Sequence, residues 1–304
     1  MAPVENVFAA RRFTGRRKAE SIKRQFRLNG GRRVATSTKR LIRRSIAAAG
    51  PVVGWCAAKG WLDRGAHGFS FLDGFGAGSG WDAEAEAIAA AALIQSSDPV
   101  IFDVGANRGV WSQKLAANLG SKRGRYFLFE VAPYCFEPLR AACDALGNAT
   151  IIPLAVGDKP GTASFYKPEE FSGLASLHER RDVGVRQRTY DVMEVECVTL
   201  DAFVEKQGID TVAFAKFDIE GHELFALKGA SNLLAAQRIT ALQFEFGSAN
   251  VNSRTFFRDF WDLLKGNGYN IYRVIPGGGR VEIERYSERL EYFHSATNYL
   301  AVAA

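Results

Sequence analysis

Two acidic residues stand where a parallel sheet would present its ligand. The stretch "VIFDVGANRG" places Asp103 inside a glycine-containing loop, and "FLFE" ends on Glu130, 27 residues later. A carboxylate at the end of the second strand of an open sheet can accept hydrogen bonds from both hydroxyls of a ribose. The two stretches therefore predict a nucleotide-like ligand, and the composition of the loop indicates which kind.

The loop departs from the dinucleotide fingerprint G-x-G-x-x-G. Its glycines are Gly105 and Gly109, and Asn107 takes the place of the glycine that lets backbone approach a pyrophosphate. Asp103 would repel phosphates but would attract a cationic group. S-adenosylmethionine carries an ammonium, a sulfonium and a ribose but no phosphate, so we expect these four residues to hold it. Asp158, which ends "AVGD", could accept from the adenine amino group or simply form a turn.

A second acidic group follows the predicted fourth strand, in "KFDIEGHE" (216–223). Asp218 and Glu220 are two residues apart, so they share one side of an extended chain. A hydroxyl is a weak nucleophile, and its methylation calls for a base or a metal ion. Three roles stay open for these carboxylates: general base, ligands of a divalent cation, or contact with the methionine ammonium. His222 is a further candidate base, because its ordinary pKa lies near neutrality.

Other charged residues accompany this group. Glu245 ends the strand "ALQFEFG" and is predicted to face the same edge of the sheet and meet the acceptor, while Lys216 is predicted to pair with a neighbouring carboxylate. The segment 159–198 carries four arginines that could bind an anionic acceptor or form a solvated charged face. They are Arg180, Arg181, Arg186 and Arg188.

Alternating helices and strands, which begin near residue 81, must position these side chains. Continuous apolar stretches such as "PVIFDVG" are typical of strands covered on both faces, and helical spacing follows them. This alternation predicts an α/β, doubly wound, mostly parallel sheet with ligands at the carboxyl ends of its strands. The segment 159–198 interrupts the rhythm and predicts a β insertion after the third strand.

The sequence at this point resembles the FkbM family of class I methyltransferases over residues 95–304. The resemblance implies a Rossmann-like sheet of seven strands with the last one antiparallel. It also implies S-adenosylmethionine-dependent O-methylation of a hydroxyl on a sugar, a glycan or a glycosylated natural product. One departure is Val131-Ala132, since proline often follows the acid in the family. The motifs are "DVGANRG" (103–109), "FE" (129–130), "AVGD" (155–158), "TLD" (199–201), "KFDIEGHE" (216–223), "LKGA" (227–230), "QFEFG" (243–247) and "TNYLA" (297–301).

Three other functions compete with this one. An NAD-dependent oxidoreductase would need the missing G-x-G-x-x-G. A methyltransferase of base amino groups would carry Asn/Asp-Pro-Pro-Tyr/Phe where this chain has "DIEG" (218–221), and no nucleic-acid partner is expected. A non-catalytic binding module on the same fold is the third alternative, although the acidic residues of a working site are all present.

Charge divides the chain of 304 residues into an arm and a body. Residues 1–50 carry a net charge of +12 and the remainder −6, so the basic character belongs to an arm that is predicted to be flexible. Such an arm could bind nucleic acid or act as a transit peptide, but peripheral contact with anionic membranes is favoured. Residues 51–94 are predicted as a helical or irregular extension of the domain 95–304.

Neither a membrane span nor a cysteine framework is predicted. The most apolar run, residues 45–58, is shorter than the roughly 20 residues that a spanning helix needs, and no signal-peptide pattern precedes it. The four cysteines form no C-x-x-C pair and lack a histidine cluster, which argues against zinc and disulfides. A cytoplasmic, membrane-peripheral location is therefore expected, while the oligomeric state is left open.

Overall fold

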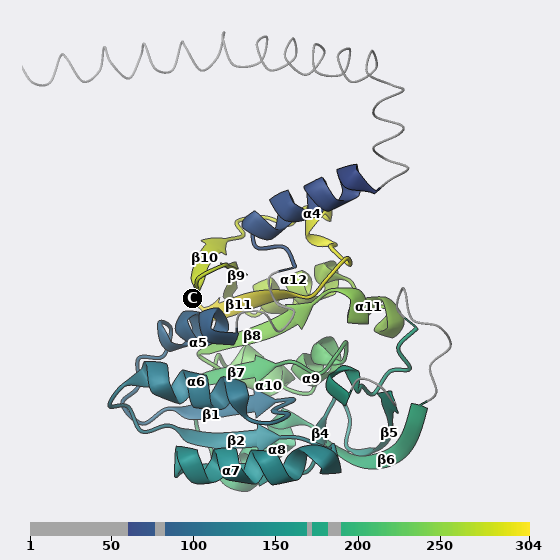
Figure 1. Ribbon diagram of the computed structural model, residues 1–304. Helices are drawn as coiled ribbons and strands as arrows, with labels where there is room; N and C mark the ends of the chain where they lie inside the picture. The colour runs from purple at the N-terminus through teal and green to yellow at the C-terminus, as the bar shows by residue number, and fades with distance from the viewer. Residues whose placement is uncertain (1–59, 77–82, 169–171, 182–189) are drawn as a thin grey trace, which may run out of the picture. The chain divides into compact units, whose positions relative to one another are not determined.

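The computed structural model describes residues 60–76, 83–168, 172–181 and 190–304 (Figure 1). The chain divides into two units, residues 1–67 and 68–304. Of the first unit, the structure describes only residues 60–67, most of which belong to helix α4 (Trp61–Leu72). The predicted basic arm, Arg186 and Arg188 lie outside the described residues, so membrane contact of the arm stays a prediction. No helix of the described part combines the length and apolar character that crossing a bilayer requires.

The main sheet of the second unit confirms the doubly wound, mostly parallel fold. In the described residues it has eight strands in the order β10-β9-β11-β8-β7-β1-β2-β3. Strand β11 lies antiparallel between β8 and β9, as the resemblance implies. The extra strand is β10, which pairs antiparallel with β9 at the edge, so this sheet is one strand wider than expected. The strands are β1 (Val100–Val104), β2 (Arg125–Phe129), β3 (Ala149–Ile152), β7 (Phe214–Phe217), β8 (Ala241–Phe246), β9 (Tyr269–Ile275), β10 (Gly279–Glu282) and β11 (Thr297–Ala303).

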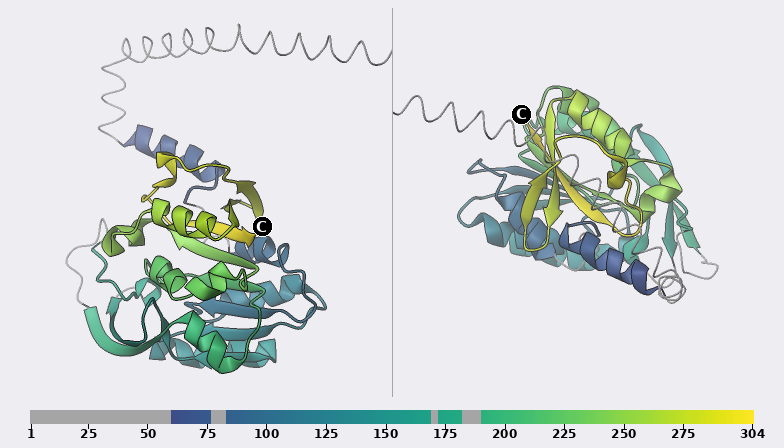
Figure 2. Two further views of the ribbon diagram at one scale, coloured as in Figure 1. Left: turned by 180° about the vertical axis from the view of Figure 1, so that it is seen from behind. Right: turned by 90° about the horizontal axis from the view of Figure 1, so that it is seen from above.

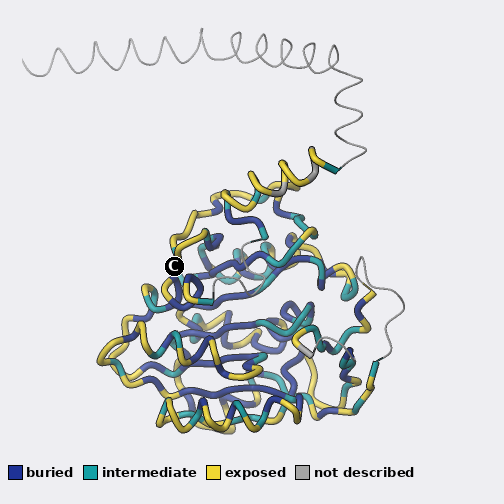
Figure 3. Tube along the Cα trace, in the orientation of Figure 1, coloured by how far each residue is buried: buried dark blue, intermediate teal, exposed yellow. Residues whose placement is uncertain are grey.

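Helices cover both faces of this sheet (Figures 1 and 2). Successive residues of β1 point to opposite faces, and both faces have to be covered. Ile101 and Phe102 are both fully buried, but they belong to the hydrophobic cores on opposite faces of the sheet. Figure 3 shows the buried residues following the strands of the sheet. One face is covered by α5 (Ala83–Ala91), α6 (Val110–Leu119) and α7 (Phe136–Leu146). The other is covered by α8 (Leu200–Gln207), α9 (Glu223–Lys228), α10 (Ser231–Ala235) and α12 (Phe257–Gly266).

Within the described residues, the predicted insertion contributes β5 and β6 to a second sheet, which β4 completes in the order β4-β6-β5. In β6, Val195 is buried between two exposed glutamates, Glu194 and Glu196, as the alternating pattern indicates. The sequence predicts one continuous third strand through "ATIIPLAVGD", but the chain leaves the main sheet after Ile152 and enters the second sheet. Pro153 lies at this change of sheet and has no N–H to donate to a ladder. The strands are β4 (Ala155–Val156), β5 (Gly161–Pro168) and β6 (Tyr190–Val198).

Candidate functional site

A cavity of about 790 Å³ opens at the carboxyl ends of β1, β2, β7 and β8, where open α/β sheets bind ligands. Its lining combines the glycine loop after β1 with acidic residues at the ends of β2, β7 and β8. The insertion supplies further lining residues, including Phe165, Leu174 and Arg180. Seven of the residues singled out in the sequence meet here. They are Gly105, Asn107, Glu130, Arg180, Asp218, Glu220 and Glu245.

The glycine loop is held closely against the neighbouring strand ends. The N–H groups of Gly105 and Ala106 both donate to the carbonyl oxygen of Phe129, at 3.0 Å. Gly105 has φ +87°, and a Cβ at this position would lie 1.9 Å from the carbonyl oxygen of Asp218. Asn107 adopts φ +49°, a left-handed conformation that asparagine tolerates. The loop therefore contacts both the end of β2, through Phe129, and the end of β7, through Asp218.

Glu130 fixes this loop through its carboxylate. It is only 9% exposed and accepts three backbone hydrogen bonds, from the N–H groups of Asn107, Val131 and Ala132, at 2.8–2.9 Å. Burial nevertheless raises the pKa of its carboxyl group, and the three donors act against that rise. A carboxylate has about four acceptor positions, so one is left for a ligand in this arrangement. Besides its predicted contact with ribose, Glu130 thus determines the shape of the loop.

Asp103 and Gly109 lie outside the lining, although both were expected to hold the cofactor directly. The side chain of Asp103 is fully buried below the loop, where one carboxylate oxygen accepts from Ser112 Oγ at 2.6 Å. A Cβ on Gly109 would lie 2.6 Å from the Cβ of Ala142, so this glycine permits close packing of α6 on α7. Asp103 can influence the cavity through its charge, and Gly109 through the position of the helix.

Asp158 is not part of the cavity either. It is exposed after β4 and borders a separate surface hollow beside α8. The prediction of an adenine contact assumed that the third strand runs on to this residue. The chain changes sheet at Pro153, so the structure does not bring Asp158 to the cavity, and the adenine contact stays a prediction. The corresponding part of the cavity is lined by apolar side chains, which suit a flat ring. They include Leu154, Val156 and Phe165.

The end of β7 carries a buried ion-pair network. Lys216, which is 6% exposed, lies 2.6 Å from Asp218 and 3.8 Å from Glu86 of α5. Burial by itself would lower the pKa of Lys216, but the surrounding carboxylates, Asp218 foremost, hold it above its ordinary value. The predicted pairing of Lys216 is confirmed. No sequence pattern indicates the contact with Glu86, which lies 130 residues earlier in the chain.

Three carboxylates meet on the acceptor side of the cavity. Among the described residues, oxygens of Asp218, Glu220 and Glu245 lie within 4.8 Å of one another. Burial, followed by the charge of Asp218, raises the pKa of Glu245 well above its ordinary value. Asp218 is paired with Lys216, and Glu220 is paired with Arg180. A divalent cation would have to compete with both side chains, so the predicted metal role of Asp218 and Glu220 stays a prediction.

His222 does not reach this group and lies outside the cavity lining. Its Nδ1 is 2.9 Å from Nε2 of His178, and its ring stacks on Phe225 at a centroid distance of 4.7 Å. Burial and the neighbouring His178 lower the pKa of His222 to about 3. The structure therefore does not bring His222 together with the three carboxylates, and its role as a catalytic base stays a prediction. The helix that begins after it turns the ring toward the insertion instead.

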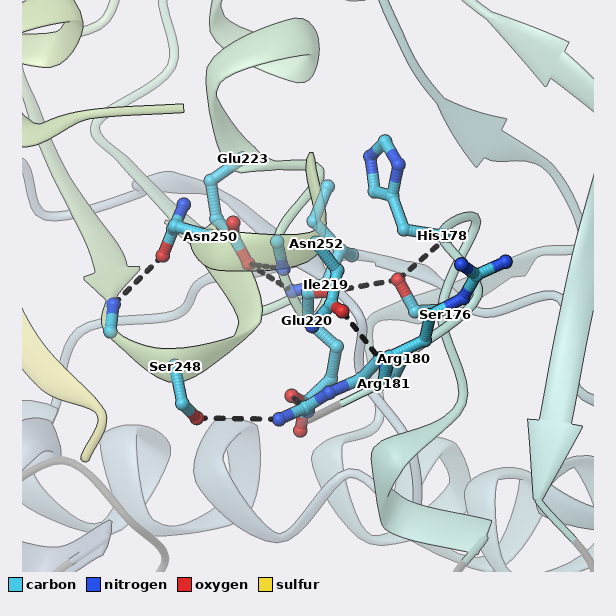
Figure 4. Close-up of polar contacts among 12 residues, drawn as sticks. Ser176, His178, Arg180, Arg181, Ile219, Glu220, Glu223, Ser248, Asn250 and Asn252 are labelled. Carbon is cyan, nitrogen blue, oxygen red and sulfur yellow. Dashed lines mark hydrogen bonds and ion pairs between the residues drawn. The ribbon is translucent and has the colours of Figure 1, made fainter. Parts of the chain in front are cut away.

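A carboxylate that sequence reasoning missed shapes the turn after β7. Oε1 of Glu223 accepts from the N–H groups of Ile219 and Gly221, both at 3.0 Å (Figure 4). Glu223 is 1% exposed, and burial raises the pKa of its carboxyl group to about 7. The available signal was its place in the first turn of a helix that follows a tight turn, where acids bind free N–H groups. Glu223 thereby positions Glu220 at the cavity.

The low pKa of His222 makes a pH dependence of stability testable. Unfolded His222 takes up a proton near its ordinary pKa of 6.5, whereas the native residue does so only near pH 3. The unfolded chain binds more protons between these values, so this histidine costs stability as the pH falls below 6.5. We expect His222→Gln to lose less stability than the unaltered protein between pH 6.5 and 5, measured by urea unfolding.

The difference in pH dependence between His222→Gln and the unaltered protein reports on His222 alone. The raised pKa of Glu223 has the opposite effect, because the native state then binds more protons between pH 4.5 and 7. That contribution is present in both proteins and cancels. Equal pH slopes for the two proteins would contradict the assigned environment of His222.

A match to a family model and a curated relative both indicate a methyltransferase. The family model of the methyltransferase FkbM domain matches residues 103–271. The hexuronic acid methyltransferase AglP of Haloferax volcanii is 30% identical over 152 residues, which are 49% of this chain and 57% of the relative. The match thus spans little more than half of that protein's length.

Solved structures show more distant similarity. A methyltransferase FkbM from Methylobacillus flagellatus KT has 16% sequence identity and a TM-score of 0.43, over 69% of this chain and 45% of the other. A protein from Streptococcus mutans described as a methyltransferase, solved in complex with SAH, has 9% identity and a TM-score of 0.41. That match covers 73% of this chain and 97% of the other.

Proposed function

Because the chain belongs to the FkbM family of methyltransferases, we propose that it transfers a methyl group from S-adenosylmethionine to a hydroxyl oxygen of a sugar or glycan. The observation that carries this proposal is the continuity of the cavity. Its lining runs from the Gly105 loop and Glu130, the predicted cofactor side, to Asp218 and Glu220 on the acceptor side. The name of the Haloferax volcanii relative supports a sugar acceptor.

The cofactor side offers complementary groups for a cationic nucleoside. Gly105 lets the loop lie against the end of β7, Glu130 retains an acceptor position for ribose, and the apolar lining beyond β3 suits the adenine ring. Near the end of β7, the carboxylates provide the negative potential that a sulfonium favours. No pyrophosphate cradle is present in the described glycine loop, which speaks against the alternative of an NAD-dependent oxidoreductase.

The acceptor side supplies position and a proton acceptor. Methyl transfer is an in-line displacement, so the acceptor oxygen must approach the methyl carbon opposite the sulfur, and such orientation can account for much of the rate. The new carbon–oxygen bond forms as the carbon–sulfur bond breaks, and its electron pair stays on sulfur. The hydroxyl proton has to leave, and a carboxylate of the Asp218–Glu220–Glu245 group lies where it can receive it.

Glu130→Ala tests the proposed cofactor. The substitution removes the ribose acceptor and three loop hydrogen bonds, so we expect S-adenosylmethionine to bind at least tenfold more weakly in calorimetry. Glu137→Ala, on the exposed first turn of α7, is the control and should bind normally. Failure of the unaltered protein to bind S-adenosylmethionine at millimolar concentration, with NAD binding instead, would refute the proposal.

Product analysis separates the remaining alternatives. Incubation with labelled methyl donor and glycans should give an alkali-stable methyl ether; an alkali-labile product would show that a carboxyl group is methylated instead. Loss of transfer after chelation would favour the metal role of Asp218 and Glu220. Cofactor binding without transfer to any of a broad set of glycans would favour the non-catalytic binding module.

A further inference from the structure

The insertion brings a buried cation to the acceptor side of the cavity. Arg180 is only 6% exposed and lines the cavity, although arginine side chains are mostly exposed in proteins. Its guanidinium pairs with the carboxylate of Glu220 and lies 3.4 Å from Ser248 Oγ (Figure 4). The positive charge of Arg180 therefore lies beside the Asp218–Glu220–Glu245 group on the acceptor side.

The backbone around Arg180 is anchored by contacts that do not involve its guanidinium. Tyr190 Oη donates to the carbonyl oxygen of Arg180, and the N–H of Arg181 donates to Asn252 Oδ1 at 2.8 Å. Ser176 Oγ donates to the carbonyl oxygen of Glu220 at 2.8 Å, which ties the segment to the end of β7. The guanidinium can thus exchange partners while the chain that carries it stays in place.

The pairing with Arg180 also limits what Glu220 can do. A carboxylate beside a guanidinium is stabilised in its charged form, so it is a poor proton acceptor. Once an anion of the acceptor takes its place at the guanidinium, the same carboxylate, which lies beside Asp218 and Glu245, is released from that pairing. The partner of Arg180 therefore controls whether Glu220 can act as a base.

We propose that Arg180 is the binding site for a carboxylate group of the acceptor, as in a uronic acid, and that this carboxylate displaces Glu220 from the guanidinium. Glu220 then receives the proton of the hydroxyl being methylated, while the methyl carbon leaves sulfur for the hydroxyl oxygen. Arginine pairs with planar carboxylates through two parallel hydrogen bonds. A phosphate dianion would add a second negative charge next to three carboxylates, so it is disfavoured. This inference rests on the proposed methyl transfer.

Binding of simple sugars tests the first part of the proposal. Glucuronate, glucose and glucose 6-phosphate serve as probes in ligand-observed NMR, with and without S-adenosylhomocysteine. We expect glucuronate to bind at least tenfold more tightly than glucose, and Arg180→Gln to abolish that preference. Arg180→Lys, which keeps the positive charge but not the planar guanidinium, should retain part of the preference for glucuronate. Equal binding of glucuronate and glucose, an unchanged preference in Arg180→Gln, or tighter binding of glucose 6-phosphate would overturn the proposal.

Two controls separate this test from folding and from the proposed function. Arg181→Gln removes the neighbouring arginine, whose side chain is 78% exposed, and should keep the preference for glucuronate. S-adenosylmethionine should bind Arg180→Gln as it binds the unaltered protein, which also shows that the variant is folded. A protein that prefers glucuronate but does not bind S-adenosylmethionine would refute the methyl transfer and leave the carboxylate site standing.

Glu220→Gln tests the exchange itself. Glutamine cannot compete for the guanidinium as an anion, so glucuronate should bind this variant at least as tightly as the unaltered protein. Methyl transfer to a glucuronate-terminated acceptor should fall about 100-fold or more in kcat, the usual range for loss of a general base, with KM unchanged or lower. Weaker binding of glucuronate, or an unaltered kcat, would contradict the exchange.

Discussion

Gly105→Ala is expected to abolish binding of S-adenosylmethionine at millimolar concentration. The new Cβ would lie 1.9 Å from the carbonyl oxygen of Asp218, so the loop and the end of β7 would have to separate. The residue also holds φ +87°, which disfavours any side chain. Together these effects should cost about 2–4 kcal/mol of folding free energy and displace the loop that Glu130 holds. Calorimetry with S-adenosylmethionine and urea unfolding measure the two consequences.

Gly147→Ala is the matched control for this prediction. Gly147 ends α7 at φ +73°, but a Cβ there would meet no atom within 4 Å. It should therefore show only the conformational cost, about 1 kcal/mol, with cofactor binding intact. If both variants bind the cofactor alike, the contact between the loop and β7 is not what positions the ligand.

Lys216→Met is expected to lower the free energy of unfolding by about 3–5 kcal/mol at neutral pH, the usual cost of removing one member of a buried ion pair. It leaves Asp218 and Glu86 without their common cation and Asp103 without a nearby positive charge. Burial already raises the pKa of the carboxyl groups of Glu86 and Asp103. Without Lys216 these values rise further, so the variant takes up protons on folding and its deficit should shrink as the pH falls.

Urea unfolding at pH 7.5 and 5.5 measures this deficit. Lys206→Met, on the exposed side of α8, is the control and should change stability by less than about 0.5 kcal/mol at either pH. A deficit for Lys216→Met that stays constant with pH would mean that loss of packing, rather than the uncompensated carboxylates, destabilises the protein.

The sequence was sufficient to predict the position of a side chain where the local pattern and the topology of the sheet together determine it. The carboxyl ends of parallel strands share one edge, so apolar runs that end in acids predicted that Glu130 and Asp218 would lie at the same edge of the sheet. Placement differs from expectation where a single local event redirects the chain. The chain changes sheet at Pro153, which leaves Asp158 outside the cavity, and the turn held by Glu223 points His222 away from it.

Other features depend on contacts between distant segments and have no local signal. The approach of Glu86 to Lys216 follows from packing α5 on the sheet, and nothing in "DAEAEAIAAAALIQ" distinguishes its buried glutamate from its exposed one. The pairing of Arg180 with Glu220 likewise requires the insertion to fold over the cavity. Sequence reasoning placed Arg180 among four similar arginines, and burial alone singled it out.

The position of β11 has a consequence for the order in which the protein can be assembled during synthesis. The chain is synthesised through β9 and β10 before β11, yet among the described strands β9 joins the main sheet only through β11, which pairs with β8 on its other side. The edge of β9 in the β9–β10 hairpin therefore stays unpaired until β11 is inserted between β9 and β8. Such delayed, non-local pairing slows folding and leaves an exposed edge open to wrong partners.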